Sequence, residues 1–327
     1  MISKLSSSFY NSARSSSAGT AALAAMLLLG FTPQRSLGCA CGCGIFEVGT
    51  SSMLPTSEGG MLFFNDDYQD QNHNWSGTSE APAANNDDKE ISTNFFTTGL
   101  QYMFNRSWGA QIEIPYDTRY FKTTGGASGD DIVSLRWSQL GDIRIQGIYT
   151  GFSSDLSTGL TFGVKLPSGS YTHNDAYGDV DRDSEIGTGS TDLLLGAFHR
   201  GDLVSGSSWQ WFVQANLDQP VLFSDGYRPG LELDSAIGIN YGGWTVGGVG
   251  VTPIAQVLGS DRARDSGPNA ADPVASGYQR VLLSPGIEIN LHPVHIYADV
   301  ERPVYQHMTG NQLVAPLLFK LSASVHF

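Results

Sequence analysis

Short segments with a two-residue period recur along this chain of 327 residues, and they constrain its fold more than any other feature. In segment 156–166, Leu160, Phe162 and Val164 alternate with small or polar residues, and segment 321–327 alternates apolar residues with Ser, Ser and His. Such alternation is typical of β-strands with one apolar face. The same pattern occurs in segments 107–116, 141–151, 209–218, 231–241, 279–291 and 294–302. The sequence therefore predicts an all-β protein.

The polar faces of these segments carry charged residues, and aromatic residues such as Trp108, Tyr149, Trp209 and Tyr241 lie near the segment ends. Aromatic girdles of this kind are typical of transmembrane barrels, although soluble β-sandwiches also alternate. No second long apolar stretch follows the N-terminal region, so helical membrane spans are not expected. We predict a transmembrane antiparallel β-barrel of about 12 strands, with about 10 or 14 as the alternatives.

The N-terminal region has the features of an export signal. Lys4 and Arg14 precede an apolar run over 18–31, which is too short for a comfortable membrane span. Ser36 and Gly38 then provide small residues for cleavage. We predict a signal peptide that is cleaved after residue 38. The alternative is a lipoprotein signal with an acylated cysteine at the next position.

The predicted organisation has three parts. They are a signal peptide over 1–38, a cysteine-rich segment over 39–58 and a barrel over 59–327. The chain ends on Phe327, and bacterial outer-membrane barrels resemble it in ending on an aromatic strand that the barrel-assembly machinery reads. We therefore expect the Gram-negative outer membrane as location, with its lipid and that machinery as partners.

Charge excludes one class of partner. Cleavage would remove three of the 18 basic residues and no acidic residue, leaving 15 against 32 and a formal charge of −17. Nucleic-acid binding requires basic patches, so we do not expect it. The longer polar tracts, expected as external loops, are 65–91, 122–138, 167–187, 219–229 and 257–277.

Three glycine-containing stretches resemble the pattern of a known family. They are Gly141-Asp142-Ile143-Arg144-Ile145-Gln146-Gly147, then 160–171 with its Leu-Pro-Ser-Gly, and 187–196 with its Gly-Thr-Gly-Ser. In this order they resemble outer-membrane transporters that are associated with phenol meta-cleavage gene clusters. The resemblance covers about residues 95–327. It implies a porin-like barrel and no catalytic residues.

All three cysteines lie in one short stretch, Cys39, Cys41 and Cys43. Three thiolates and a free amino group can bind Cu(I) or Zn(II), and the intervening glycines let the backbone wrap a small ion. The alternative is a flexible leader whose thiols oxidise or carry lipid. No other cofactor is expected.

The remaining polar clusters predict no catalysis. Carboxylates alternate over 179–185 as in a calcium loop, but the glycine and final glutamate of an EF-hand are missing, so a solvated acidic loop is expected. His292, His295 and His307 fit a polar lumen network better than a metal site. No G-x-S-x-G or Walker sequence occurs, and we predict no enzymatic activity.

We expect an outer-membrane channel for passive passage of a small solute, including aromatic or amphipathic compounds. Opposed charges across its lumen would select the solute. The predicted pore-lining residues are Glu113, Arg144, Lys165, Asp192, Gln214, Asp234, Arg280, Glu288, Asp299 and Lys320. The alternatives are a closed barrel with a metal-binding, cysteine-rich N-terminus and an outer-membrane barrel that hydrolyses lipid.

Overall fold

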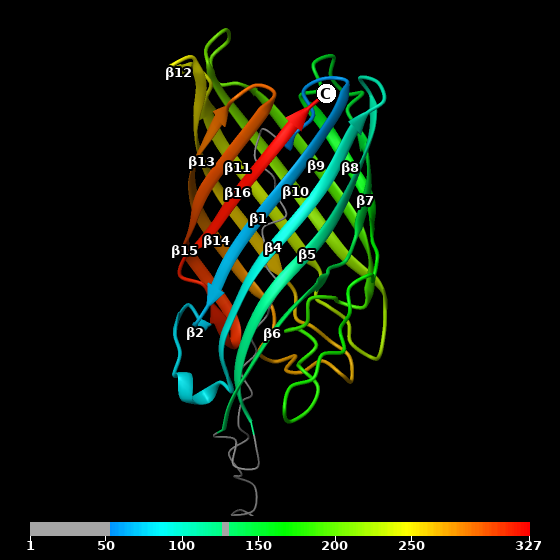
Figure 1. Cartoon of the computed structure of the whole chain (residues 1–327), viewed down its shortest axis with the longest axis vertical. Coiled ribbons are helices and arrows are strands. Elements are labelled where there is room, and N and C mark those ends of the chain that lie inside the picture. The colour runs from blue at the N-terminus through cyan, green and yellow to red at the C-terminus, as the bar shows by residue number, and fades with distance from the viewer. Residues whose placement is uncertain (1–52, 126–130) are drawn as a thin grey trace, which may run out of the picture. The chain divides into compact units, whose positions relative to one another are not determined.

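The computed structural model describes residues 53–125 and 131–327, and within them twelve antiparallel strands close into one barrel (Figure 1). In order round the wall, the strands are β1 (Gly59–Gln71), β4 (Asp88–Met103), β5 (Trp108–Gly125), β7 (Arg144–Tyr149), β8 (Thr158–Lys165), β9 (Ser190–Asp202), β10 (Trp209–Phe223), β11 (Glu232–Tyr241), β13 (Val249–Arg262), β14 (Tyr278–Asn290), β15 (Val294–Val314) and β16 (Leu318–His326). The ring closes because β16 pairs with both β15 and β1. The predicted fold class and strand number are confirmed.

Four further, mostly short strands pair with strands of the barrel wall or with each other. They are β2 (His73–Gly77), β3 (Ser79–Glu80), β6 (Asp131–Leu140) and β12 (Trp244–Val246), and one 3-10 turn covers Ala83–Asn85. Strand β6 pairs with the C-terminal half of β5, and β7 pairs with the N-terminal half of β5. Over the described ranges, no helix has the length and apolarity to cross a bilayer.

Backbone hydrogen bonds join the chain end to the start of the first strand. The backbone N–H of Gly60 donates to the Phe327 carbonyl at 2.7 Å, and the Phe327 N–H returns a hydrogen bond at 2.9 Å. A Cβ at Gly60 would lie 2.3 Å from the exposed Phe327 ring, so a larger residue at position 60 would displace that ring. Recognition of this terminus by assembly machinery stays a prediction.

The strands separate an apolar exterior from a polar interior. In β16, Leu321 is 50% exposed, whereas Ser322 and Ser324 are each 5% exposed and point inward. The outward face of β1 likewise carries Leu62 and Phe64. Because an apolar outer surface and a closed hydrogen-bonded wall are what a bilayer requires, this arrangement suits lipid.

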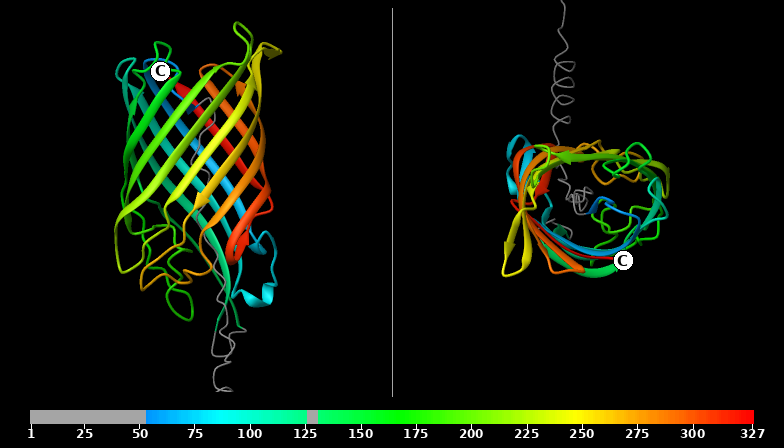
Figure 2. Two further views of the ribbon diagram at one scale, coloured as in Figure 1. Left: turned by 180° about the vertical axis from the view of Figure 1, so that it is seen from behind. Right: turned by 90° about the horizontal axis from the view of Figure 1, so that it is seen from above.

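The two ends of the barrel differ, as Figures 1 and 2 show. One end carries the start of β1, the end of β16 and short connections such as 104–107 and 291–293. The opposite end carries the longer connections 72–87, 166–189 and 263–277. In outer-membrane barrels, short turns face the periplasm and long loops face outward.

Several predicted loop boundaries are wrong. Tracts 65–91 and 122–138 are largely strand, because β1, β4, β5 and β6 continue beyond the segments that alternate clearly. The tracts 219–229 and 257–277 likewise begin within β10 and β13. Outside the bilayer both faces of a strand meet water, so the backbone ladder can continue after the apolar alternation has ended.

Candidate functional site

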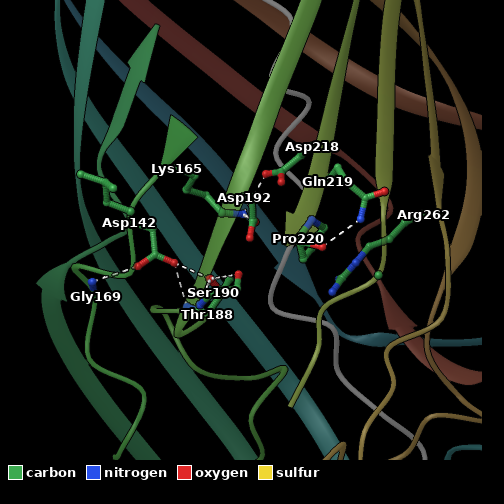
Figure 3. A network of polar contacts seen from close by, with 12 residues as sticks. Asp142, Lys165, Gly169, Thr188, Ser190, Asp192, Asp218, Gln219, Pro220 and Arg262 are labelled. Atoms are coloured by element: carbon green, nitrogen blue, oxygen red, sulfur yellow. Dashed lines mark hydrogen bonds and ion pairs between the residues drawn. The ribbon is translucent and has the colours of Figure 1, made fainter. Parts of the chain in front are cut away.

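The inward face of the barrel is built around paired charges. Lys165 Nζ lies 2.8 Å from Asp218 Oδ2 and also contacts Asp192, so one lysine joins two carboxylates from neighbouring strands (Figure 3). Across the seam, Lys320 Nζ lies 3.1 Å from Asp67 Oδ1. All these groups are largely shielded from solvent. Pairing offsets the cost of removing each charge from water.

Three cavities follow one another inside the barrel. A vestibule of about 640 Å³ lies at the short-turn end and is lined by residues including Arg200, Asp202, Trp211, Glu288, His295 and His326. A middle chamber of about 120 Å³ is lined by residues including Asp67, Gln101, Glu113, Arg144, Gln214 and Lys320. A loop-side chamber of about 120 Å³ is lined by residues including Asp117, Arg119, Arg144, Lys165, Arg182 and Arg262. Polar cavities of this size hold water.

A segment before the first strand lies between the vestibule and the middle chamber. Met53 to Pro55 line the middle chamber, and Thr56 with Ser57 lines the vestibule. The Arg200 guanidinium donates to the Pro55 carbonyl at 3.1 Å, and Leu54 is buried in the apolar cluster inside the barrel. Figure 2 shows this first described part of the chain within the ring of strands. Residues 53–57 therefore narrow the path from the short-turn end.

The connection between β8 and β9 narrows the other end. Arg119 Nη1 donates to the carbonyls of Ser184 (2.7 Å) and Glu185 (2.9 Å). Val180 and Ile186 pack in an apolar cluster with side chains of β4, β5 and β6. The expectation of a solvated acidic loop over 179–185 is therefore wrong in part. Asp183 and Glu185 are buried, because Arg119 and the cluster hold the loop against the wall.

Asp142 holds both ends of this loop (Figure 3). Its Oδ1 accepts a hydrogen bond from the Gly169 N–H at 2.9 Å. Its Oδ2 accepts from the Thr188 N–H at 2.9 Å and from the Thr188 hydroxyl at 2.6 Å. A Cβ at Gly187 would lie 2.3 Å from the backbone of Gly169, so the loop ends meet only where Gly187 has no side chain. The three stretches that carry the family resemblance meet at this clamp.

Asp183 makes the packing of the loop depend on pH. Burial and, next, the nearby charge of Asp265 raise the pKa of Asp183 from 3.8 to about 7, although Arg262 opposes the shift. The packed loop thus holds this proton more tightly than an unpacked loop does. Packing is fully favoured below about pH 4 and weakens as the pH rises through about 7.

We expect amide hydrogen exchange of residues 170–189, corrected for intrinsic rates, to become faster from about pH 5 to pH 8. The Asp183 carboxyl of the packed loop loses its proton within this range. Asp183→Asn should abolish this increase, because the amide does not ionise. An equal increase in Asp183→Asn and in the unsubstituted protein would contradict the role of this carboxyl.

The structure places the ten residues predicted to line the pore on the inward side of the wall. Glu113, Arg144, Gln214 and Lys320 line the middle chamber, Arg144 and Lys165 the loop-side chamber, and Glu288 the vestibule. Asp192, Asp234, Arg280 and Asp299 are buried. Contact of these residues with a passing solute stays a prediction.

Buried polar partners surround two members of this set. Asp299 Oδ2 accepts hydrogen bonds from Ser284 (2.7 Å), Tyr297 (2.6 Å) and Gln256 (3.1 Å). Arg280 lies over the Tyr278 ring at 4.2 Å. These contacts make both groups part of the wall's internal framework.

Sequence reasoning missed Arg119, the role of Asp142 and the segment 53–57. Arg119 follows the end of the predicted segment 107–116, and nothing local shows that its partners lie some 65 residues away. Asp142 lies in the break between β6 and β7, and the neighbouring Gly141 was the only local indication of that break. Tertiary contacts alone reveal these roles.

The predicted metal site lies near the N-terminus of the chain. Cys39, Cys41 and Cys43 lie outside the described residues, so Cu or Zn binding there stays a prediction, as does the signal peptide. Over 53–125 and 131–327, no group of three or more His, Cys, Asp or Glu side chains can hold a metal ion. His295 instead contacts Glu288 at 3.2 Å and the His326 ring.

No protein-family model matches the chain, and no curated protein sequence matches it either. Among solved structures, the COG4313 outer membrane channel from Pseudomonas putida F1 is similar to it, with a TM-score of 0.63, 12% identity, and coverage of 86% of this chain and 100% of that chain. The beta domain of the Bordetella autotransporter BrkA has a TM-score of 0.48, 13% identity, and coverage of 83% and 100%. A Pseudomonas aeruginosa FadL homologue has a TM-score of 0.43, 10% identity, and coverage of 82% and 90%. The first of these similarities shows a shared barrel fold. The chain has the barrel fold of Gram-negative outer-membrane channel proteins.

Proposed function

We propose that this protein is an outer-membrane channel through which a small solute passes passively. The observation that carries the proposal is the series of three polar cavities inside a barrel with an apolar exterior. A structural barrel without transport would be expected to fill its interior with side chains. The long acidic connections then face the outside of the cell.

The size of the solute follows from the two narrow points. The segment 53–57 and the loop over 182–186 lie at either side of chambers of about 120 Å³ each. Each chamber has room for a few water molecules, so a passing molecule must be small or must displace one of these segments.

Charge on the wall supports selection of polar or amphipathic solutes. The middle chamber brings Asp67 and Glu113 together with Arg144 and Lys320. Opposite charges around a constriction create a transverse field that favours dipolar or charged groups. The resemblance to transporters of phenol-degradation clusters makes small aromatic compounds the first solutes to test.

The test begins with the full chain expressed in a Gram-negative host and purified from the outer-membrane fraction. In a planar bilayer we expect stable stepwise currents, with block by the solutes that enter the lumen. A folded, heat-modifiable protein that carries no current would overturn the open-channel proposal. That result would favour a barrel closed by its N-terminal segment.

A further inference from the structure

One side chain lies at the junction of two chambers. Among the described residues, only Arg144 lines both the middle chamber and the loop-side chamber. It is the first residue of β7, immediately after the break that carries Asp142. A solute that moves from one chamber to the other must therefore pass this guanidinium.

Acidic groups lie on both sides of that junction. Glu113 is the cross-strand partner of Arg144 on β5 and lines the middle chamber. Asp117 and Asp142 line the loop-side chamber. On the other flank, Lys165 is the cross-strand partner on β8, but it is already engaged by two carboxylates. Acidic side chains thus line both chambers that meet at Arg144.

This placement has two consequences for a passing solute. A guanidinium at a narrow point repels cations and presents a planar fork of donors to carboxylate or phenolate oxygens. Conduction also requires release, and the carboxylates in both chambers compete with a bound anion for the guanidinium. The junction therefore favours brief binding of small anions.

We propose that Arg144 is the specificity-determining residue of the channel and that it admits small organic anions bearing a carboxylate or phenolate group. The inference rests on the proposed channel function. Besides Arg144, the two chambers are lined by eight acidic and five basic side chains, so without this cation the pore should prefer cations.

The experiment compares Arg144→Gln with the unsubstituted protein in a planar bilayer under a KCl gradient. We expect the reversal potential to move toward the cation value and the conductance to rise about two-fold or more, since a charge and bulk leave the junction. Benzoate should block the unsubstituted channel more strongly than the variant. Arg144→Lys should keep the ion preference, because it keeps the positive charge. It should weaken the benzoate block, because lysine lacks the planar pair of N–H donors of the guanidinium.

The matched control is Arg136→Gln, which removes an exposed arginine that lies over Tyr120 on the adjacent strands and lines none of these chambers. It should behave as the unsubstituted protein. If the unsubstituted channel conducts but Arg144→Gln keeps its reversal potential, conductance and block, the role of Arg144 is overturned while the channel function stands. If no folded form conducts, both are overturned. If Arg144→Gln does not fold, an unweakened benzoate block in Arg144→Lys overturns the inference.

Discussion

Replacing Lys165 with alanine is expected to lower the free energy of unfolding by about 3–5 kcal/mol. The ammonium group lies 2.8 Å from Asp218 and also contacts Asp192, whose side chain is completely buried. Removing the cation leaves two neighbouring carboxylates inside the barrel without their shared partner. Their mutual repulsion and poor hydration would then oppose folding.

Urea unfolding in lipid vesicles, followed by heat-modifiable mobility and tryptophan fluorescence, measures this loss. Lys122→Ala, which removes a half-buried lysine of β5, should change stability by no more than about 0.5 kcal/mol. Adding Asp192→Asn and Asp218→Asn to Lys165→Ala should recover part of the loss. Unchanged stability in Lys165→Ala would show that the carboxylates do not depend on this lysine.

Replacing Asp142 with alanine is expected to release the loop between β8 and β9 without unfolding the barrel. The carboxylate accepts three hydrogen bonds, from Gly169 and from two groups of Thr188. A hydrogen bond to a charged group contributes about 1.5–3 kcal/mol, so losing even one should raise the open population of the loop about 10- to 150-fold.

Limited trypsin digestion of the folded protein measures that population through cleavage after Arg182, which lies in this loop. Asp142→Asn keeps one acceptor oxygen and should give an intermediate rate. Thr188→Val removes one hydroxyl donor and should give a smaller increase than alanine at position 142. Cleavage of Asp142→Ala at the unsubstituted rate, with the barrel intact, would contradict the clamp.

The Lys165 site shows where sequence reasoning succeeds. Lys165 was predicted to point into the lumen because it occupies a polar position of the alternating segment 156–166, and Asp192 was predicted to line the same lumen. The structure pairs the two side chains on the inward side of the wall. The prediction did not reveal that one lysine joins two carboxylates. That contact depends on the register between β8, β9 and β10, which no single segment encodes.

The loop shows where sequence reasoning fails. Asp183 and Glu185 lie in an acidic run, and local composition favours exposure to water. They are buried because Arg119 donates to the loop backbone and because Asp142 holds the loop ends together. The stabilising contacts come from residues tens of positions away, so the sequence pattern of the loop itself does not predict them.

The export-signal features and the aromatic residues at segment ends favoured a membrane barrel, and the sequence by itself determined the alternation of apolar and polar faces. That follows because successive strand residues point to opposite faces, whatever lies elsewhere in the chain. Only the tertiary structure decided where strands end, which charges pair, and which segments narrow the lumen. Those features depend on register around the closed ring and on contacts made by residues 53–57 and by the loop that Asp142 holds.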